Sequence, residues 1–202
     1  PVVALEPSNT VSDMLLRLSA QDDKQNIATM ELSEHDDMNA SFSLDCTALS
    51  TSKRFTYEAQ ATEKGMHVDT DIIQHVPDAE RHRRARLFLE ATRYVMDYSS
   101  QARNATSAEP SRVLIVLDSV HSRKAARYFR ANETEQENIR ADLDARDAFY
   151  VLGNDQDDEG SSVREAYEQA LGELDERGLD GGSDTILPYA ETYEALAEYR
   201  SD

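Results

Sequence analysis

Acidic side chains limit the folds open to this chain more than any other feature of its sequence. Its 202 residues include 40 Asp and Glu against 21 Lys and Arg, which gives a formal net charge of −19. An ionised carboxylate is costly to bury without a partner, so most of these groups must stay on the surface of any fold. Hydrophobic residues still make up 39% of the chain. That share, with clear periodicity, favours a folded protein over a disordered acidic tail.

Lysine is scarce even among the few basic residues. The chain has only Lys24, Lys53, Lys64 and Lys124, and the other basic residues are arginines. Carboxylates hold water and cations in concentrated salt, whereas the alkyl stem of lysine adds apolar surface that salt drives toward aggregation. The composition resembles that of proteins from halophilic archaea. It predicts a protein that works in molar salt, where the Debye length is about 3 Å, and that loses stability in dilute buffer.

The pattern up to about residue 110 predicts a strand-rich domain, residues 1–110. Apolar residues at helical spacing first predict a brief helix through Val11, Met14, Leu15 and Leu18. Alternating or apolar segments then predict strands within Asn26–Leu32, Ala40–Ala48, Lys53–Ala61 and His67–Val76. These strands are expected to form an antiparallel sheet with one solvent-exposed face.

A long helix, residues 79–99, is expected to follow Pro77 and Asp78 and to pack on this sheet. The packing stripe is predicted from apolar residues at helical spacing, namely Leu87, Ala91, Tyr94, Val95 and Tyr98. The polar segment Ser99–Pro110 is predicted to be a linker.

Residues 111–202 are predicted to form a helix-rich domain with one or two buried strands. Arg112–Asp118 is the most hydrophobic short run and predicts a strand buried on both faces. The other predicted elements are helices over Val120–Ala131 and Thr134–Ala145, a strand over Ala148–Leu152, a helix from the Ser162–Glu165 capping box to Gly178, and a last helix opened by Pro188. The fold class is therefore α+β: an antiparallel β-rich N-terminal half with a packed long helix, followed by a helix-rich C-terminal half.

Two arginine clusters are the candidate contact sites. The first lies early in the predicted long helix and contains Arg81, Arg83, Arg84 and Arg86; the second contains Arg123, Arg127 and Arg130 at i, i+4 and i+7. Positive charge near a helix N-terminus opposes the macrodipole, which suggests anionic partners on the same chain, on a neighbouring subunit or on nucleic acid. Phosphate contacts weaken steeply in high salt, so contacts between subunits are favoured over nucleic acid.

Acidic groups next to the later strands suggest a metal site as an alternative. Asp118 and the acids at 155–159 follow two predicted strands, and together they could hold a metal ion that acts on phosphates. No Gly-rich phosphate loop follows either strand. The loop Asn154–Gly160 also fails the calcium pattern, because Ala166 stands where a bidentate Glu is required. We therefore expect no catalytic residue, no metal and no cofactor.

Two stretches resemble the N-terminal sheet of distal-tail or baseplate proteins of tailed viruses. They are Tyr57-Glu-Ala-Gln-Ala-Thr62-Glu63 and Asp71-Ile72-Ile-Gln-His75-Val76-Pro77. In that family a strand runs into a Thr-Glu pair, and an Asp-Ile-x-x-His-Val turn follows at similar spacing. The resemblance covers residues 57–77 and implies a structural protein whose identical subunits build a ring.

The expected function is therefore that of a non-enzymatic structural protein of a halophilic archaeal tailed virus, in the tail, the baseplate or the head–tail connection. Its expected partners are copies of itself and neighbouring virion proteins, with assembly in the host cytoplasm. No apolar run approaches the roughly 20 residues that span a bilayer, so no membrane partner is expected. Two alternatives stay open: a cytoplasmic α/β enzyme that acts on phosphates with a carboxylate-bound metal, and an acidic DNA-binding regulator that uses Arg83 and Arg84.

Overall fold

The structure is a computed structural model that describes residues 2–4, 10–17, 27–34, 37–59, 66–95, 109–157, 160–179, 181–183 and 186–188. These residues form helices and antiparallel strand pairs, which confirms the mixed α+β class. The pairs are β1 (Val2–Ala4) with β4 (Met38–Ala40), β2 (Thr10–Arg17) with β3 (Ile27–Glu34), β5 (Thr51–Ala59) with β6 (Met66–Gln74), and β7 (Arg112–Leu117) with β8 (Phe149–Asn154). None of the described helices has the length and apolar run that crossing a bilayer requires.

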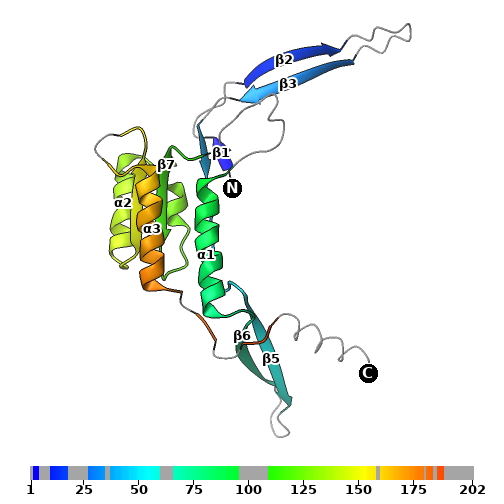
Figure 1. Ribbon diagram of the computed structural model, residues 1–202, viewed down its shortest axis with the longest axis vertical. Helices are drawn as coiled ribbons and strands as arrows, with labels where there is room; N and C mark the ends of the chain where they lie inside the picture. Colours follow the sequence, from blue (N-terminus) through cyan, green and yellow to red (C-terminus); the bar gives the residue numbers. More distant parts are fainter. Residues whose placement is uncertain are drawn as a thin grey trace.

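The body of the molecule is built on the β7–β8 pair, which is covered on both faces (Figure 1). Helix α3 (Val163–Arg177) packs on the face that carries Ile115 and Val151. On the other face, Leu114 and Val116 meet α2 (Glu133–Asp144) and the 3₁₀ helix η1 (Lys124–Arg130). Side chains alternate between the faces of a strand, so one apolar run can fill both cores. The predicted doubly buried strand is confirmed.

Helix α3 begins and ends where its sequence predicts. The Ser162 hydroxyl accepts from the Glu165 amide at 3.2 Å, and the Glu165 carboxylate accepts from the Ser162 amide at 2.9 Å. This reciprocal cap pairs backbone donors that the first turn leaves free. Gly178, with φ of 71°, ends the helix in a conformation that disfavours other residues. Apolar residues at helical spacing predict an inward stripe of Val163, Ala166, Tyr167, Ala170, Leu171 and Leu174, and all of them are buried except Leu171, which is half-buried.

Strand β8 and helix α3 approach each other so closely that only glycine fits at position 153. A Cβ on Gly153 would lie 2.8 Å from the Ala166 Cβ and 2.9 Å from the Ser162 carbonyl oxygen. We therefore expect Gly153→Ala to lower the free energy of unfolding by about 1–3 kcal/mol, as overpacking does. Denaturant unfolding in molar KCl measures this change.

Gly172 provides the matched control, because it lies in α3 and a Cβ there meets nothing within 4 Å. Gly172→Ala should raise the free energy of unfolding by about 0.5–1 kcal/mol through helix propensity. If the two alanine variants changed stability alike, the close approach at Gly153 would not constrain the fold.

Helix α1 (Asp78–Arg93) packs on α3 and not on a sheet. Leu89 contacts the core cluster of α3, and the Thr92 hydroxyl lies 3.0 Å from the Tyr167 hydroxyl. The predicted stripe is wrong, because Leu87 is 46% and Tyr94 is 58% exposed. The β5–β6 pair lies beyond the N-terminal end of α1 (Figure 1), so α3 is the neighbour along which the helix packs.

The brief helix predicted around Val11–Leu18 is also wrong. Residues Thr10–Arg17 form β2, which pairs over its full length with β3, from Thr10 opposite Glu34 to Arg17 opposite Ile27. The apolar spacing fits a helix, but the ladder of backbone hydrogen bonds satisfies the segment in an extended form. Helical spacing in so short a segment is therefore weak evidence.

Two polar side chains explain two further differences from the predicted elements. Only Ala40 of the strand predicted over Ala40–Ala48 lies in a strand, at the end of β4, because the Asp45 carboxylate accepts from the amides of Thr47 and Ala48 and forms a turn. The helix predicted from Val120 begins only at Lys124, as η1, because the Asp118 carboxylate accepts from the Val120 amide at 2.8 Å.

The C-terminal segment returns to β6 and forms a short parallel contact with its end. Ile186 pairs with Gln74, and the Leu187 amide donates to the Gln74 carbonyl at 2.8 Å. This contact and the α1–α3 packing both cross the predicted boundary at residue 110. Because 96–108 lie outside the described residues, the boundary itself stays a prediction. The last predicted helix, after Pro188, also lies outside them.

Two hairpins extend away from the body (Figure 1). Strands β2 and β3 pack on each other, and no other described helix or strand lies broadly against them. Among the described residues, those that anchor the β5–β6 hairpin lie at the end that carries Thr51 and Gln74, where His75, Arg81 and residues 181–183 and 186–187 meet it. A two-stranded hairpin is at best marginally stable in water without further packing.

Candidate functional site

Three arginines of the first cluster bind acids of the same chain. Arg83 donates to both carboxylate oxygens of Glu80 at 2.6 and 2.8 Å, and Arg84 donates to Glu80 at 2.9 Å. Arg86 donates to Asp175 on α3 at 2.6 Å. Acids of the same chain are one of the three kinds of anionic partner that the sequence left open for this cluster. A contact of these side chains with a neighbouring subunit stays a prediction.

The Glu80 carboxylate offers a pH test of this cluster. Hydrogen bonds from Arg83 and Arg84 lower the pKa of Glu80 from 4.5 to about 2. Because the folded pKa is the lower one, this carboxylate stabilises the fold above the unfolded pKa, and the contribution is lost as pH falls from about 4.5 through about 2. We expect the wild type to unfold at a higher temperature than Glu80→Gln at neutral pH and at the same temperature near pH 2. Thermal unfolding in molar KCl at stepped pH measures this, and a constant gap at all pH would contradict it.

Arg81 is a buried anchor and not a surface contact. Its side chain is 1% exposed. The guanidinium donates to five acceptors: the carbonyls of Leu49, Cys46 and Gly181 at 3.1, 3.0 and 3.4 Å, the Gln74 side chain at 3.3 Å and Asp78 at 3.3 Å. The prediction that Arg81 contacts a neighbouring subunit is corrected, because these bonds hold it inside its own chain. It joins the turn before β5, the end of β6, α1 and residue 181.

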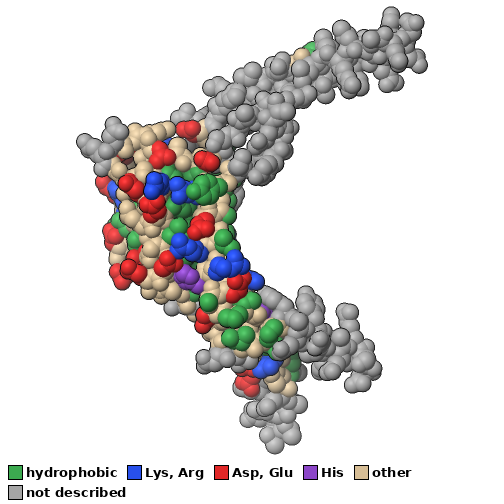
Figure 2. Space-filling model, viewed as in Figure 1, with side chains coloured by type: hydrophobic (Ala, Val, Ile, Leu, Met, Phe, Trp, Pro, Cys, Tyr) green, Lys and Arg blue, Asp and Glu red, His purple; other side chains and the backbone are tan. Residues whose placement is uncertain are grey.

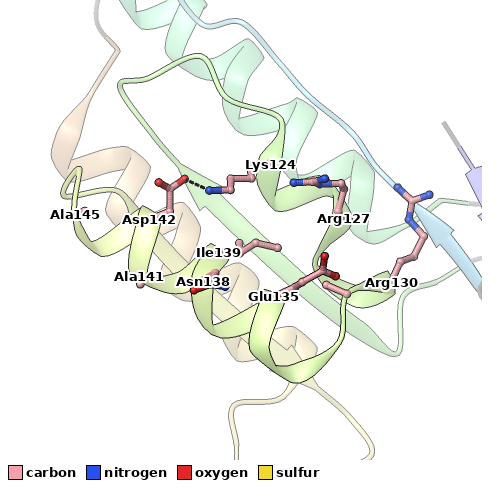
Figure 3. A pocket seen from close by; sticks show the side chains of 10 residues that line it. Lys124, Arg127, Arg130, Glu135, Asn138, Ile139, Ala141, Asp142 and Ala145 are labelled. Carbon is pink, nitrogen blue, oxygen red and sulfur yellow. Dashed lines mark ion pairs between the residues drawn. The ribbon is translucent and has the colours of Figure 1, made fainter.

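The second cluster lines a groove between η1 and α2 with a volume of about 750 Å³ (Figure 3). A 3₁₀ helix has three residues per turn, so Lys124, Arg127 and Arg130 form one row along η1. Arg123 is the N-cap and does not line the groove. The spacing of an α-helix predicts Arg123 in this row. In the 3₁₀ helix that is observed, Lys124 takes this position.

At one end of this groove, one acid pairs with two cations. Lys124 lies 3.1 Å from Asp142, which also accepts from Arg146 at 2.8 Å. These two cations lower the pKa of Asp142. Arg127 and Arg130 are exposed, and within the described residues no ion pair joins either of them to an acid. Among the cations that line the groove, these two remain open to an anionic partner.

The structure separates Asp118 from Asp155, two of the acids on which the metal-site alternative depends. Strands β7 and β8 are antiparallel, so Asp118 follows the Leu117–Phe149 end and Asp155 follows the Asn154–Arg112 end. Because Asp155 lies beside Ser111 and Asp118 follows Leu117 at the other end of β7, the two acids lie roughly 24 Å apart along the sheet. The apolar pattern of a strand carries no information on its direction, which is why the sequence analysis placed them together.

Both acids also have structural partners. Asp118 accepts from Arg146 at 2.7 Å and from the Val120 amide at 2.8 Å, and its side chain is 10% exposed. Asp155 accepts from the Val163 amide at 2.8 Å and so helps to cap α3. Asp158 and Glu159 lie outside the described residues. Across the part of the chain that is described, no cluster of His, Cys, Asp or Glu is arranged to hold a metal ion.

An exposed apolar face on the β5–β6 hairpin is the feature that the sequence analysis missed. Phe55, Tyr57, Val68 and Ile72 are 50%, 63%, 45% and 45% exposed. They share one side of the hairpin, because Tyr57 pairs with Val68 and Ile72 lies two residues beyond the partner of Phe55. We call these four residues the hairpin face. Figure 2 shows hydrophobic side chains gathered on this part of the molecule.

The opposite side of the same hairpin is polar. Arg54 donates to Asp71 at 3.0 Å, and Thr56 pairs with Asp69 in the ladder. The alternation of Phe55 and Tyr57 did predict one apolar side, which the long helix was expected to cover. That helix packs on α3, and the hairpin face is left open to solvent.

The candidate site is therefore a pair of surfaces, the hairpin face and the groove that carries Arg127 and Arg130. Within the described residues, neither surface carries a cluster of His, Cys, Asp or Glu arranged to hold a metal ion. Comparison of the chain with protein-family models, with curated proteins and with solved structures finds no match.

Proposed function

We propose that this chain is a non-enzymatic structural protein that assembles with copies of itself in molar salt, and that the hairpin face is an assembly surface. The supporting observation is the exposure of four large apolar side chains on one side of a two-stranded hairpin. Monomeric proteins rarely leave a large contiguous apolar patch exposed. Salts that are excluded from protein surfaces make such exposure more costly still. A neighbouring subunit would remove this cost and stabilise the hairpin.

The groove supplies a second contact surface in this proposal. Arg127 and Arg130 are exposed and lack an acidic partner among the described residues, in a chain with a net charge of −19. Acidic faces of the same protein are abundant, so a neighbour can provide carboxylates for both. A guanidinium is weakly hydrated and binds a carboxylate through two parallel hydrogen bonds, which suits contact ion pairs in concentrated salt.

The proposed setting is the virion of a halophilic archaeal tailed virus, in the tail, the baseplate or the head–tail connection. The resemblance of residues 57–77 to distal-tail and baseplate proteins supports it, and that stretch contains three of the four residues of the hairpin face. Assembly would take place in the host cytoplasm. In this setting the strand-rich part to about residue 110 supplies the contact hairpins and the helix-rich part from 111 supplies the body.

Two observations count against the alternative functions. The enzyme alternative needs Asp118 and the acids at 155–159 to share a metal, and the strand direction separates them. The DNA-binding alternative needs Arg83 and Arg84 to reach phosphates, and Glu80 already accepts hydrogen bonds from both.

The mass of the protein in solution tests the proposal. In molar KCl the wild type should be an oligomer by light scattering coupled to size exclusion. Tyr57→Asp should weaken association by roughly 30-fold, which corresponds to the ~2 kcal/mol of an interface hot spot. Thr56→Asp is the matched control, since it adds the same charge one residue away on the opposite side. A wild type that stays monomeric at high concentration, or two variants with the same mass distribution, would contradict the proposal.

A further inference from the structure

The hairpin face has the size and chemistry of a binding surface for one amphipathic helix. Its four apolar side chains extend from Val68 to Ile72 along β6 and over the facing part of β5. Four residues of strand span about 14 Å. Lys53 lies directly opposite Ile72 and is exposed, so a cation stands at one end of the apolar surface. A partner that buries apolar groups in the middle and brings acids to the edge would match this surface.

The C-terminal segment 189–202 has the complementary pattern. Tyr189, Tyr193, Leu196 and Ala197 fall at i, i+4, i+7 and i+8, the spacing of one helix stripe. In a helix this stripe is about 12 Å long, close to the length of the hairpin face. The acids Glu191, Glu194 and Glu198 recur at i, i+3 and i+7 on the other side. Pro188 stands where a proline favours the first turn of a helix.

The described structure favours a second copy as the source of this segment. Ile186 pairs parallel to Gln74, so the chain at Leu187 runs in the direction of β6, away from the hairpin tip and from the hairpin face. Within the single chain the four side chains of the face remain 45% to 63% exposed. At Leu187 the described chain is therefore directed away from the surface that the sequence of residues 189–202 complements.

We propose that residues 189–202 of one copy form a helix that packs on the hairpin face of a second copy. This inference rests on the proposed self-assembly and names the partner segment. Each subunit then offers one hairpin face and one helix. A helix gives a two-stranded hairpin the packing that it needs for stability, so exchange of the segment stabilises both partners.

Disulfide trapping between two different single-cysteine chains tests the exchange. Cys46, the only native cysteine, is first replaced by Ser in full-length protein. Val68→Cys and Leu196→Cys are then placed on separate chains, mixed in molar KCl and oxidised. We expect a covalent heterodimer, which only contact between copies can give. Thr56→Cys, on the opposite side of the hairpin, replaces Val68→Cys in the control mixture and should give much less. Equal yields from the two mixtures would overturn the proposal.

Both cysteines on one chain distinguish the two possible sources of the segment. A cross-link that forms within single chains, with no covalent dimer, would overturn exchange between copies. Covalent dimers and larger species support it.

A matched pair of charge substitutions separates this inference from the proposed function. Leu196→Asp places a charge in the apolar stripe and should weaken association by roughly 30-fold. Ala195→Asp, on the acidic side, should leave the mass unchanged. If Tyr57→Asp dissociated the protein while Leu196→Asp did not, this inference would fail and the proposed function would stand. A monomeric wild type would remove both.

Discussion

Arg81→Ala is expected to lower the free energy of unfolding by about 3–5 kcal/mol, the range for removal of one partner from a buried charged network. The substitution deletes a side chain that is 1% exposed and leaves the carbonyls of Leu49 and Cys46 without their donor. For a chain of this length the melting temperature should fall by roughly 10 °C. Thermal and denaturant unfolding in molar KCl measure the change.

Two further variants test whether the hydrogen bonds of Arg81 cause this loss of stability. Arg83→Ala removes an exposed arginine that binds Glu80, and it should lower the free energy of unfolding far less than Arg81→Ala does. Arg81→Met keeps the length of the side chain and removes its donors. It should remain strongly destabilising, because the Leu49 carbonyl and the buried Gln74 side chain then lose a hydrogen bond from a buried donor. A small effect of Arg81→Met would show that packing, and not hydrogen bonding, holds this junction together.

Transfer from molar KCl into dilute buffer is expected to unfold the protein. The net charge of −19 is screened over about 3 Å at 1 M salt, but over about 30 Å at 0.01 M, where repulsion acts across the whole surface. Loss of the far-ultraviolet circular dichroism signal on dialysis, and its return when KCl is restored, would report the change. A chain that stays folded in salt-free water would contradict the halophilic interpretation of its composition.

A titration with KCl separates the two physical effects of the salt. Screening is nearly complete by about 1 M, because the Debye length is then shorter than the spacing of surface charges. Any further rise in melting temperature must come from exclusion of salt from apolar surface. Sucrose, which is excluded but carries no charge, is the control. It should not replace KCl below 1 M if screening dominates there.

The elements that the sequence predicted well are those with strong local signals. The Ser162–Glu165 box predicted the start of α3, and Gly178 predicted its end. Each of these signals lies within a few residues of the backbone groups with which it forms hydrogen bonds. The run Arg112–Asp118 likewise predicted β7, because a dense apolar segment can only be buried. In these cases the local preference and the final packing agree.

The features that the sequence could not predict depend on distant parts of the chain. Nothing local marks Arg81 as buried, since its acceptors lie as far as 100 residues away. The antiparallel direction of β7 and β8, which separates Asp118 from Asp155, is set by the path through η1 and α2. The row of Lys124, Arg127 and Arg130 depends on η1 being a 3₁₀ helix, which the composition of the segment does not reveal.

The pairing of the C-terminal segment with the end of β6 also sets a time order for biogenesis. Gly181 supplies an acceptor to Arg81, and Leu187 is bonded to Gln74 and His75, with up to 112 residues between partners. On the ribosome, α1 and β6 emerge long before these partners are translated. The junction around Arg81 therefore closes only after residues 181 to 187 have been translated, since a chain cannot form contacts with residues not yet made. A product truncated before Gly181 would lack this closure, so it would differ from the longer chain at the base of the hairpin.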